Sequence, residues 1–260
     1  IGRAEAVLPN NEQSCLDGYN FNQRMKFYIM KVDERRNRPV IIVSRSHPNL
    51  VRRLFEQEIP EISSGVVEIV NISREAGSRT KIAVASSDPN VDSVGACVGQ
   101  RGLRVQAIID ELNGEKIDII EWDPDPVMYI SNALNPAKAI RVEINEDDQS
   151  ATVVVPDHQL SLAIGREGQN ARLAARLTGW KIDIKSEAQY REMIESELMS
   201  RFDQALAEDE EVWQDDSESA FDENEEYLSD EFEDDFPEDT EGVEEDDTEE
   251  PDVDISEAIQ

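Results

Sequence analysis

The chain has 260 residues, enough for one to three small domains, and a formal net charge of −34. The charge is unevenly spread: residues 1–200 hold 24 Lys and Arg against 30 Asp and Glu, whereas residues 201–260 hold 1 against 29. The acidic total therefore does not exclude nucleic-acid binding by the first 200 residues. The longest apolar runs fall far short of the ~20 residues that a membrane span needs, and the two cysteines and two histidines lack metal-ligand spacing.

The first 46 residues have the pattern of β structure. Residues 2–9 alternate apolar and polar side chains, and residues 24–32 and 39–45 are two further strand-like runs on either side of the basic turn Asp33–Arg38. Three strands are too few for a closed β domain, so we expect the back half of one. The chain starts at Ile1 without a methionine, and we expect its true beginning to be missing.

A new pattern begins at His47. A helix is predicted over residues 47–62, with Pro60 as its stop, and a hairpin follows in "GVVEIVNISRE" and "RTKIAVASS". Asp88 is predicted to cap the next helix. A further helix has a core-facing stripe and leads into the strand "KIDIIEW"; the stripe consists of Val105, Ile108, Ile109 and Leu112.

The same order of elements then repeats. A helix over residues 127–133, a hairpin in "AIRVEIN" and "ATVVVP", a short helix capped by Asp157, a second helix and the strand "KIDIK" follow one another. The glycines Gly99 and Gly165 are 66 residues apart, and the "KIDI" strands, at Lys116 and Lys181, are 65 apart. This spacing indicates an internal repeat of a whole α-β-β-α-α-β unit.

The residues after the repeat divide into a helix and an acidic tail. The stretch Ser186–Gln189 has the pattern of a capping box, and apolar residues recur every four positions from Tyr190, so we expect a helix to residue 207 that packs on the second repeat. From Glu208 the chain is acidic and has no period. Such a segment buries too little surface to offset its ordering entropy, and we expect it to be disordered.

Each repeat contains a Gly-x-x-G tetrapeptide directly before a helix, "GQRG" from Gly99 and "GREG" from Gly165. A helix N-terminus attracts phosphate, and glycine lets a sugar–phosphate backbone approach the main chain. A KH module grips about four nucleotides of single strand with such a loop. A single Gly-x-x-G tetrapeptide could be a plain helix–turn–helix corner. Here the tetrapeptide occurs twice, each time followed by a helix and a "KIDI" strand, which chance does not produce. A mononucleotide-binding loop is excluded because no Gly-Lys-Ser/Thr follows.

At this point the residues resemble a known family. "VGQRGLRVQAIIDELNGEKIDIIEW" and "LSLAIGREGQNARLAARLTGWKIDI" are similar to the two KH modules of the NusA family of bacterial transcription factors. "GRAEAVLPNNEQ" and "PVIIVSRSHPNLVRRLFEQEIPEI" resemble the end of its S-one type OB domain and the following linker. The acidic residues 208–260 do not resemble the folded acidic repeats of many relatives, so functions tied to those repeats are not carried over.

The resemblance implies an α+β fold: a partial OB-type β-barrel, two tandem type-II (prokaryotic) KH domains, a helix and a disordered acidic tail. The expected limits are 1–46 for the S-one part, 47–123 and 124–187 for the KH domains, 188–207 for the helix and 208–260 for the tail. The RNA-binding residues are expected in the two loops and the first turns after them: Gly99, Gln100, Arg101, Gly102, Arg104, Gly165, Arg166, Glu167, Gly168, Gln169, Asn170 and Arg172.

The resemblance also implies a function. We expect a cytoplasmic, monomeric RNA-binding elongation factor that binds nascent single-stranded RNA and modulates pausing, termination and antitermination. Its expected partners are RNA polymerase, contacted through an N-terminal domain that this chain lacks, and other antitermination factors. No catalytic residue, metal or cofactor is expected. The alternatives are a KH protein acting in translation or ribosome assembly, and the RNA-binding part of an RNA-degrading enzyme.

Glu167 stands out because it is a carboxylate in a loop expected to bind phosphate, where the first loop has Arg101. Three interpretations are open. Glu167 points to solvent, or it pairs with Arg166 or Arg172, or it weakens the second loop so that the first dominates. We favour the third.

Overall fold

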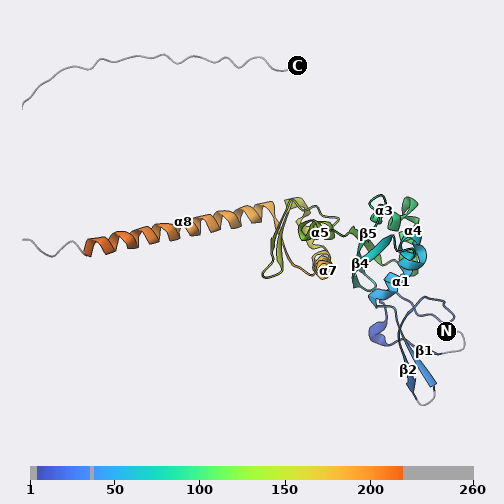
Figure 1. Ribbon diagram of the computed structural model, residues 1–260. Helices are drawn as coiled ribbons and strands as arrows, with labels where there is room; N and C mark the ends of the chain where they lie inside the picture. Colours follow the sequence, from blue (N-terminus) through green and yellow to red (C-terminus); the bar gives the residue numbers. More distant parts are fainter. Residues whose placement is uncertain (1–4, 36–37, 219–260) are drawn as a thin grey trace, which may run out of the picture. The chain divides into compact units, whose positions relative to one another are not determined.

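A computed structural model describes residues 5–35 and 38–218 of the chain (Figure 1). The chain divides into two units, residues 1–205 and residues 206–260. Part of the predicted turn Asp33–Arg38 and the predicted disorder of residues 219–260 lie outside the described residues.

The N-terminal part forms a three-stranded sheet with the order β1-β3-β2. Strands β2 and β3 form an antiparallel hairpin, and β1 lies parallel to β3. The strand β2 begins four residues later than expected. The elements are β1 (Ala6–Val7), the short 3-10 helix η1 (Asn10–Glu12), β2 (Tyr28–Arg35) and β3 (Arg38–Ser44). That this sheet belongs to an OB barrel stays a prediction.

The first repeat has the predicted order α-β-β-α-α-β. In its sheet β4 pairs with β5 in antiparallel fashion and β5 pairs with β6 in parallel. The predicted helix over residues 47–62 is two helices, because Pro60 starts a new short helix after Ile59. The elements are α1 (Pro48–Glu58), α2 (Pro60–Ser63), β4 (Val67–Glu75), β5 (Arg79–Ser86), α3 (Ser93–Val98), η2 (Gln100–Gly102), α4 (Leu103–Glu111) and β6 (Lys116–Glu121).

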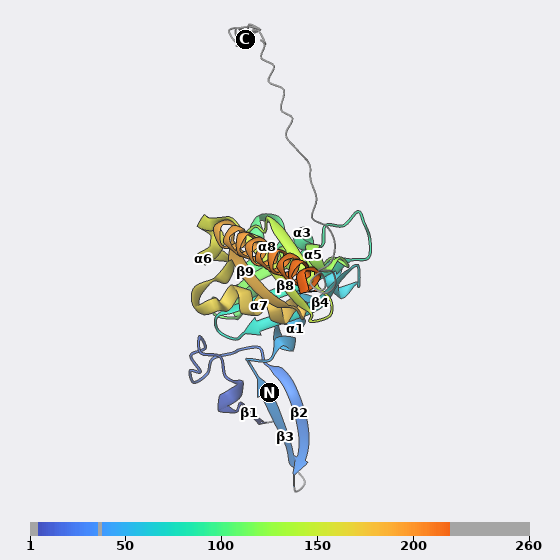
Figure 2. The same ribbon diagram turned by 90° about the vertical axis from the view of Figure 1, so that its left-hand side faces the viewer.

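The second repeat has the same order and the same strand directions. Figure 2 shows its helices α6 and α7 beside strands β8 and β9. Each repeat has its own buried apolar cluster, with Phe55 and Ile82 in the first and Ile130 and Val153 in the second. The elements are α5 (Pro126–Ala133), β7 (Arg141–Asn145), β8 (Ser150–Val155), η3 (Asp157–Gln159), α6 (Leu160–Ile164), η4 (Arg166–Gly168), α7 (Gln169–Thr178) and β9 (Lys181–Ser186).

Two predicted helix caps are wrong. Asp88 accepts from the backbone N–H of Asn90 in a local turn, and helix α3 starts later, with Asp92 accepting from the N–H groups of Val94 and Gly95. An aspartate side chain can accept from backbone N–H groups in a turn as well as at a helix N-terminus, so the sequence could not decide whether Asp88 or Asp92 caps α3. Asp157 lies inside η3, and its carboxylate accepts from the backbone N–H of Ala188.

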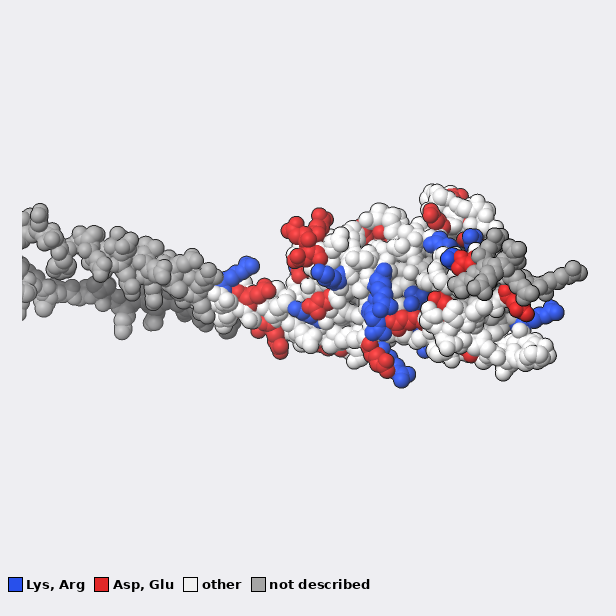
Figure 3. All heavy atoms as spheres, turned by 90° about the horizontal axis from the view of Figure 1, so that it is seen from below, with Lys and Arg blue, Asp and Glu red and all other residues white. Residues whose placement is uncertain are grey.

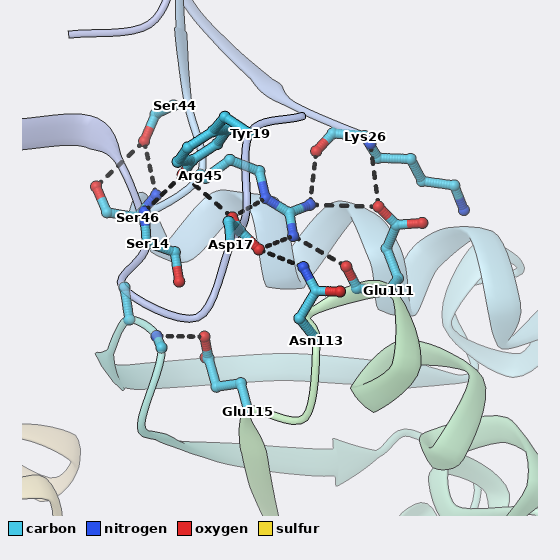
Figure 4. A network of polar contacts seen from close by, with 12 residues as sticks. Ser14, Asp17, Tyr19, Lys26, Ser44, Arg45, Ser46, Glu111, Asn113 and Glu115 are labelled. Carbon is cyan, nitrogen blue, oxygen red and sulfur yellow. Dashed lines mark hydrogen bonds and ion pairs between the residues drawn. The ribbon is translucent and has the colours of Figure 1, made fainter. Parts of the chain in front are cut away.

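The N-terminal part is joined to the first repeat by a buried arginine (Figure 4). Arg45 is 1% exposed and donates both to the carboxylate of Asp17, at 2.7 and 2.9 Å, and to the carboxylate and backbone carbonyl of Glu111 at the end of α4. Its remaining bond goes to the backbone carbonyl of Lys26. The side chain of Asn113 also donates to Asp17. These contacts fix the start of the chain against helix α4.

The last helix, α8 (Glu187–Glu218), is longer than expected and packs on the second repeat over less of its length than expected. It continues eleven residues past 207, so residues 208–218 are helical and not disordered. Their glutamates are strong helix formers even without an apolar stripe. The capping box at Ser186 and Gln189 is confirmed. The predicted packing holds only near Tyr190, which donates to Glu143, because Leu198 and Phe202 are exposed.

Candidate nucleic-acid interface

The two Gly-x-x-G loops have the same backbone conformation. Gly99 and Gly165 have φ of 72° and 77° with ψ near 175°, and both end the preceding helix. The third residues, Arg101 and Glu167, both have φ of 54°, in the left-handed region that non-glycine residues rarely adopt. The repeat in the sequence is therefore a repeat of loop geometry, and Arg101 and Glu167 occupy equivalent positions.

The first glycine of each loop is also required by close packing. A Cβ at Gly99 would lie 2.7 Å from the Cγ of Arg104, and a Cβ at Gly165 would lie 2.8 Å from both the backbone nitrogen and the Cβ of Asn170. At Gly102 and Gly168 a Cβ would meet nothing within 4 Å. The first glycine therefore allows each loop to close onto the helix that follows it.

Two of the predicted RNA-binding side chains act as internal braces of these loops. Arg104 donates to the backbone carbonyl of Ala96 at 2.6 Å and to Glu61 at 2.9 Å. Asn170, in the equivalent position, donates at 3.0 Å to the carbonyls of Ala163 and Leu134 and is only 1% exposed. The side chain of Asn170 therefore faces the interior, which corrects the expectation that it reaches RNA. The braces are equivalent although the residue types differ.

Two further predicted residues are bonded to the first repeat. Gln169 donates to Glu75 at 2.8 Å and to the hydroxyl of Ser78 at 2.7 Å, and Arg172 donates to Glu75 at 2.6 Å. Glu75 ends strand β4, and the contact spans 97 residues of sequence. No periodicity in the sequence could have indicated this partner.

The loop tips remain exposed. Gln100, Arg101, Arg166 and Glu167 are all exposed, and the Arg166 and Glu167 side chains are 92% and 81% exposed, with 3.7 Å between Nε and Oε1. A pair so exposed contributes little stability. Figure 3 shows basic groups lying beside acidic groups on one face of the molecule rather than a patch of one sign. Charge on that face does not by itself mark a binding surface, so the loops define the candidate site. RNA contact by these residues stays a prediction.

Exposed apolar side chains flank both loops. Leu103, which starts α4, is 69% exposed, and Leu162 and Ile164, which precede the second loop, are 47% and 38% exposed. None of these three side chains is among the RNA-binding residues expected from the sequence. The sequence did carry a signal for them: they are apolar residues that lie next to a Gly-x-x-G loop but outside the buried apolar stripe of the neighbouring helix.

The remaining reactive groups do not suggest catalysis or metal binding. Cys97, in α3, is fully buried, and burial raises the pKa of its thiol to about 12. His47 caps α1 by accepting from the backbone N–H of Asn49. Among residues 5–35 and 38–218, no cluster of three His, Cys, Asp or Glu could hold a metal. None of the described helices is long and apolar enough to cross a membrane.

The fold and the loops define a tandem KH protein. A family model described as the NusA-like first KH domain matches residues 45–122, and one described as the NusA-like second KH domain matches residues 126–192. The chain belongs to the NusA family. The predicted domain limits at residues 46, 123 and 187 stay predictions.

Relatives named "Transcription termination/antitermination protein NusA" match most of the chain. The protein from Halalkalibacterium halodurans is 53% identical over 214 residues, which are 82% of this chain and 56% of the relative. The Bacillus subtilis protein is 57% identical over 193 residues, 74% of this chain and 52% of the relative. The Thermus thermophilus protein is 44% identical over 221 residues, 83% of this chain and 57% of the relative. The chain spans about half the length of these relatives.

Proposed function

We propose that the chain binds nascent single-stranded RNA through both loops and is the RNA-binding part of a transcription elongation factor. The factor modulates pausing, termination and antitermination by RNA polymerase, which is its proposed partner together with other antitermination factors. The relatives' names support this role, since they are those of a transcription factor and not of an enzyme. The two cysteines, which form no disulfide, support a cytoplasmic location.

The observation that carries the proposal is the duplicated loop. Helices α4 and α7 each begin directly after a positive-φ glycine, so each presents its N-terminal backbone N–H groups at an exposed turn. A phosphate backbone can lie along such a turn, while bases lie on the neighbouring apolar side chains Leu103, Leu162 and Ile164. Two such clamps in one chain would grip one strand at two places.

The test replaces the loop tips with acidic residues in the full chain. Gln100→Asp and Arg101→Asp, combined with Arg166→Asp and Glu167→Asp, put like charge against phosphate, and aspartate tolerates the left-handed backbone at Arg101 and Glu167. Fluorescence anisotropy with a labelled single-stranded RNA should show a loss of affinity of at least about tenfold, or ~1.4 kcal/mol. Circular dichroism and melting should stay near those of the unmodified chain.

A control places two aspartates away from the loops, with Ser196→Asp and Ser200→Asp on the exposed surface of α8. This control should bind RNA within about twofold of the unmodified chain. Equal affinity of the folded loop variant and the control would overturn RNA binding by the loops. Co-sedimentation with ribosomes, without co-purification of RNA polymerase, would favour a role in translation instead.

A further inference from the structure

Helix α7 of the second KH domain packs on the sheet of the first. The side chain of Asn71, on β4, donates to the backbone carbonyl of Leu177 at 3.2 Å, and the buried Lys81, on β5, donates to the backbone carbonyl of Asn135 at 2.8 Å. The helix that begins at the second clamp loop therefore lies directly on strands of the other domain.

Arg172 joins the first domain to this loop. Its Nε and Nη2 donate to the two carboxylate oxygens of Glu75, at 2.6 and 3.2 Å, in a bidentate pair. Its Nη1 donates to the backbone carbonyl of Glu167 at 3.2 Å. The guanidinium thus bridges Glu75 on strand β4 and the backbone of Glu167, the non-glycine residue of the loop that has positive φ.

Glu75 is held in place from several sides. It accepts from Arg172 and Gln169, and Arg176 lies 3.6 Å from its Oε1. Its side chain is 21% exposed. The hydrogen bond from Arg172 is the main reason why the pKa of Glu75 lies below its ordinary value, so the carboxylate is ionised at neutral pH.

Within the described part of the chain, no equivalent bridge reaches the first loop. The residue equivalent to Arg172, 66 positions earlier, is Gln106, and its amide donates to Asp110 on its own helix. A non-glycine residue at positive φ costs about 1 kcal/mol or more, so a bond to the carbonyl of Glu167 is well placed to hold a conformation that the loop would otherwise leave.

We propose that Glu75 and Arg172 are positioning residues, and that Arg172 is a strut through which the first KH domain holds the second clamp loop in its RNA-binding conformation. The inference rests on the proposed function. It differs from the expectation that Arg172 contacts RNA directly, and the two models predict opposite effects of removing the Glu75 charge. If Arg172 contacts RNA directly, Glu75→Gln would release its side chain, and RNA binding would become tighter. If Arg172 is a strut, Glu75→Gln would remove its anchor on the first domain, and RNA binding would weaken.

The experiment uses the full chain with the first loop disabled by Gln100→Asp and Arg101→Asp, so that affinity for a labelled single-stranded RNA reports the second clamp. In this background Glu75→Gln should weaken binding about threefold to fivefold, since a partly exposed ion pair is worth up to about 1 kcal/mol. Glu68→Gln is the control, because it removes an exposed carboxylate from the same strand and should leave affinity within about twofold. Tighter or unchanged binding by Glu75→Gln would overturn the strut.

Two further measurements keep the outcome decisive. Arg172→Lys retains a cation that suits phosphate but loses the bidentate fork, so the strut predicts weaker binding and a direct contact predicts little change. Amide hydrogen exchange at residues 166–169 should speed up in Glu75→Gln whether or not RNA is present. Unchanged exchange there would contradict the strut. Absence of RNA binding by the unmodified chain would instead refute the proposed function and leave the exchange result to decide the strut.

Discussion

The two clamp loops share a backbone but not a charge. Their φ values agree within about 5° at all three positions with positive φ, yet one tip carries Gln100 and Arg101 and the other Arg166 and Glu167. The first tip therefore has a net charge of +1 and the second has none. The glycines and the following helix determine the loop shape, and because the tip side chains take no part in packing, they are free to differ.

The loops also differ in how they are supported. Arg104 braces the first loop to Glu61, which belongs to the same domain. The second loop is braced from inside by Asn170 and from the other domain through Arg172. A change in the contact between the domains should therefore affect the second clamp and leave the first unaffected.

The largest expected effect tests the shared backbone. Gly165→Ala should lower the free energy of unfolding by about 3 kcal/mol and Gly99→Ala by about 2 kcal/mol, because both adopt conformations that essentially only glycine populates. The loss is larger at Gly165 because the new Cβ meets backbone rather than a side chain. Urea unfolding followed by circular dichroism measures both. Gly102→Ala and Gly168→Ala, which have open space, should each lose only about 1 kcal/mol; equal losses at all four glycines would contradict the close-packing argument.

The next effect tests the charge difference. With the first loop disabled, Glu167→Gln should tighten RNA binding by no more than about tenfold, or ~1.4 kcal/mol. In the unmodified background, Arg101→Gln should weaken binding by a similar factor. Both changes should shrink as salt rises, since screening acts within ~8 Å at physiological ionic strength. Weaker binding by Glu167→Gln would mean that its carboxylate orients an arginine or accepts from a base.

A smaller effect tests the support from the other domain. The folded-state pKa of Glu75 lies below its ordinary value of 4.5, mainly because Arg172 donates to it. Its contribution to stability is therefore fully present above about pH 4.5 and is lost as the pH falls through the folded-state pKa. Unfolding in urea should show Glu75→Gln to be less stable than the unmodified chain at pH 6, and the difference should be smaller at pH 3. A stability difference that is the same at both pH values would show that the charge is not involved.

The smallest effect concerns the helix before the first loop. Cys97 is fully buried and occupies the position equivalent to Ala163, whereas Cys15 is exposed. A thiol reagent at pH 8 should modify one cysteine per folded chain, because burial keeps Cys97 protonated. Arg104→Ala, which removes the brace of the first loop, should make Cys97 react faster. Mass spectrometry of the labelled peptides measures both rates, and prompt labelling of Cys97 in the unmodified chain would contradict the buried position.

The repeated unit, the loop positions and the core stripe of the helix after the first loop could be predicted from the sequence, because they depend on helical periodicity and on motifs that recur at a fixed spacing of 65 or 66 residues. Ile108 and Leu112 are buried as their helical spacing indicates. The partners of Asn170 and Arg172 within the protein could not be predicted, since polar side chains beside a Gly-x-x-G loop look the same in sequence whether they face RNA or a neighbouring domain. Glu75 was missed because its partners lie more than 90 residues away.

Arg45 has a consequence for how the protein unfolds. A guanidinium has five N–H donors, and Arg45 makes five hydrogen bonds, to Asp17, Lys26 and Glu111. Cutting the chain near residue 46 would leave Arg45 paired with Asp17 but would remove its two hydrogen bonds to Glu111 and the bond from Asn113 to Asp17. The buried polar groups left without these partners would be destabilising. The N-terminal sheet and the first KH domain should therefore melt as one cooperative block, whatever boundary their sequence patterns suggest.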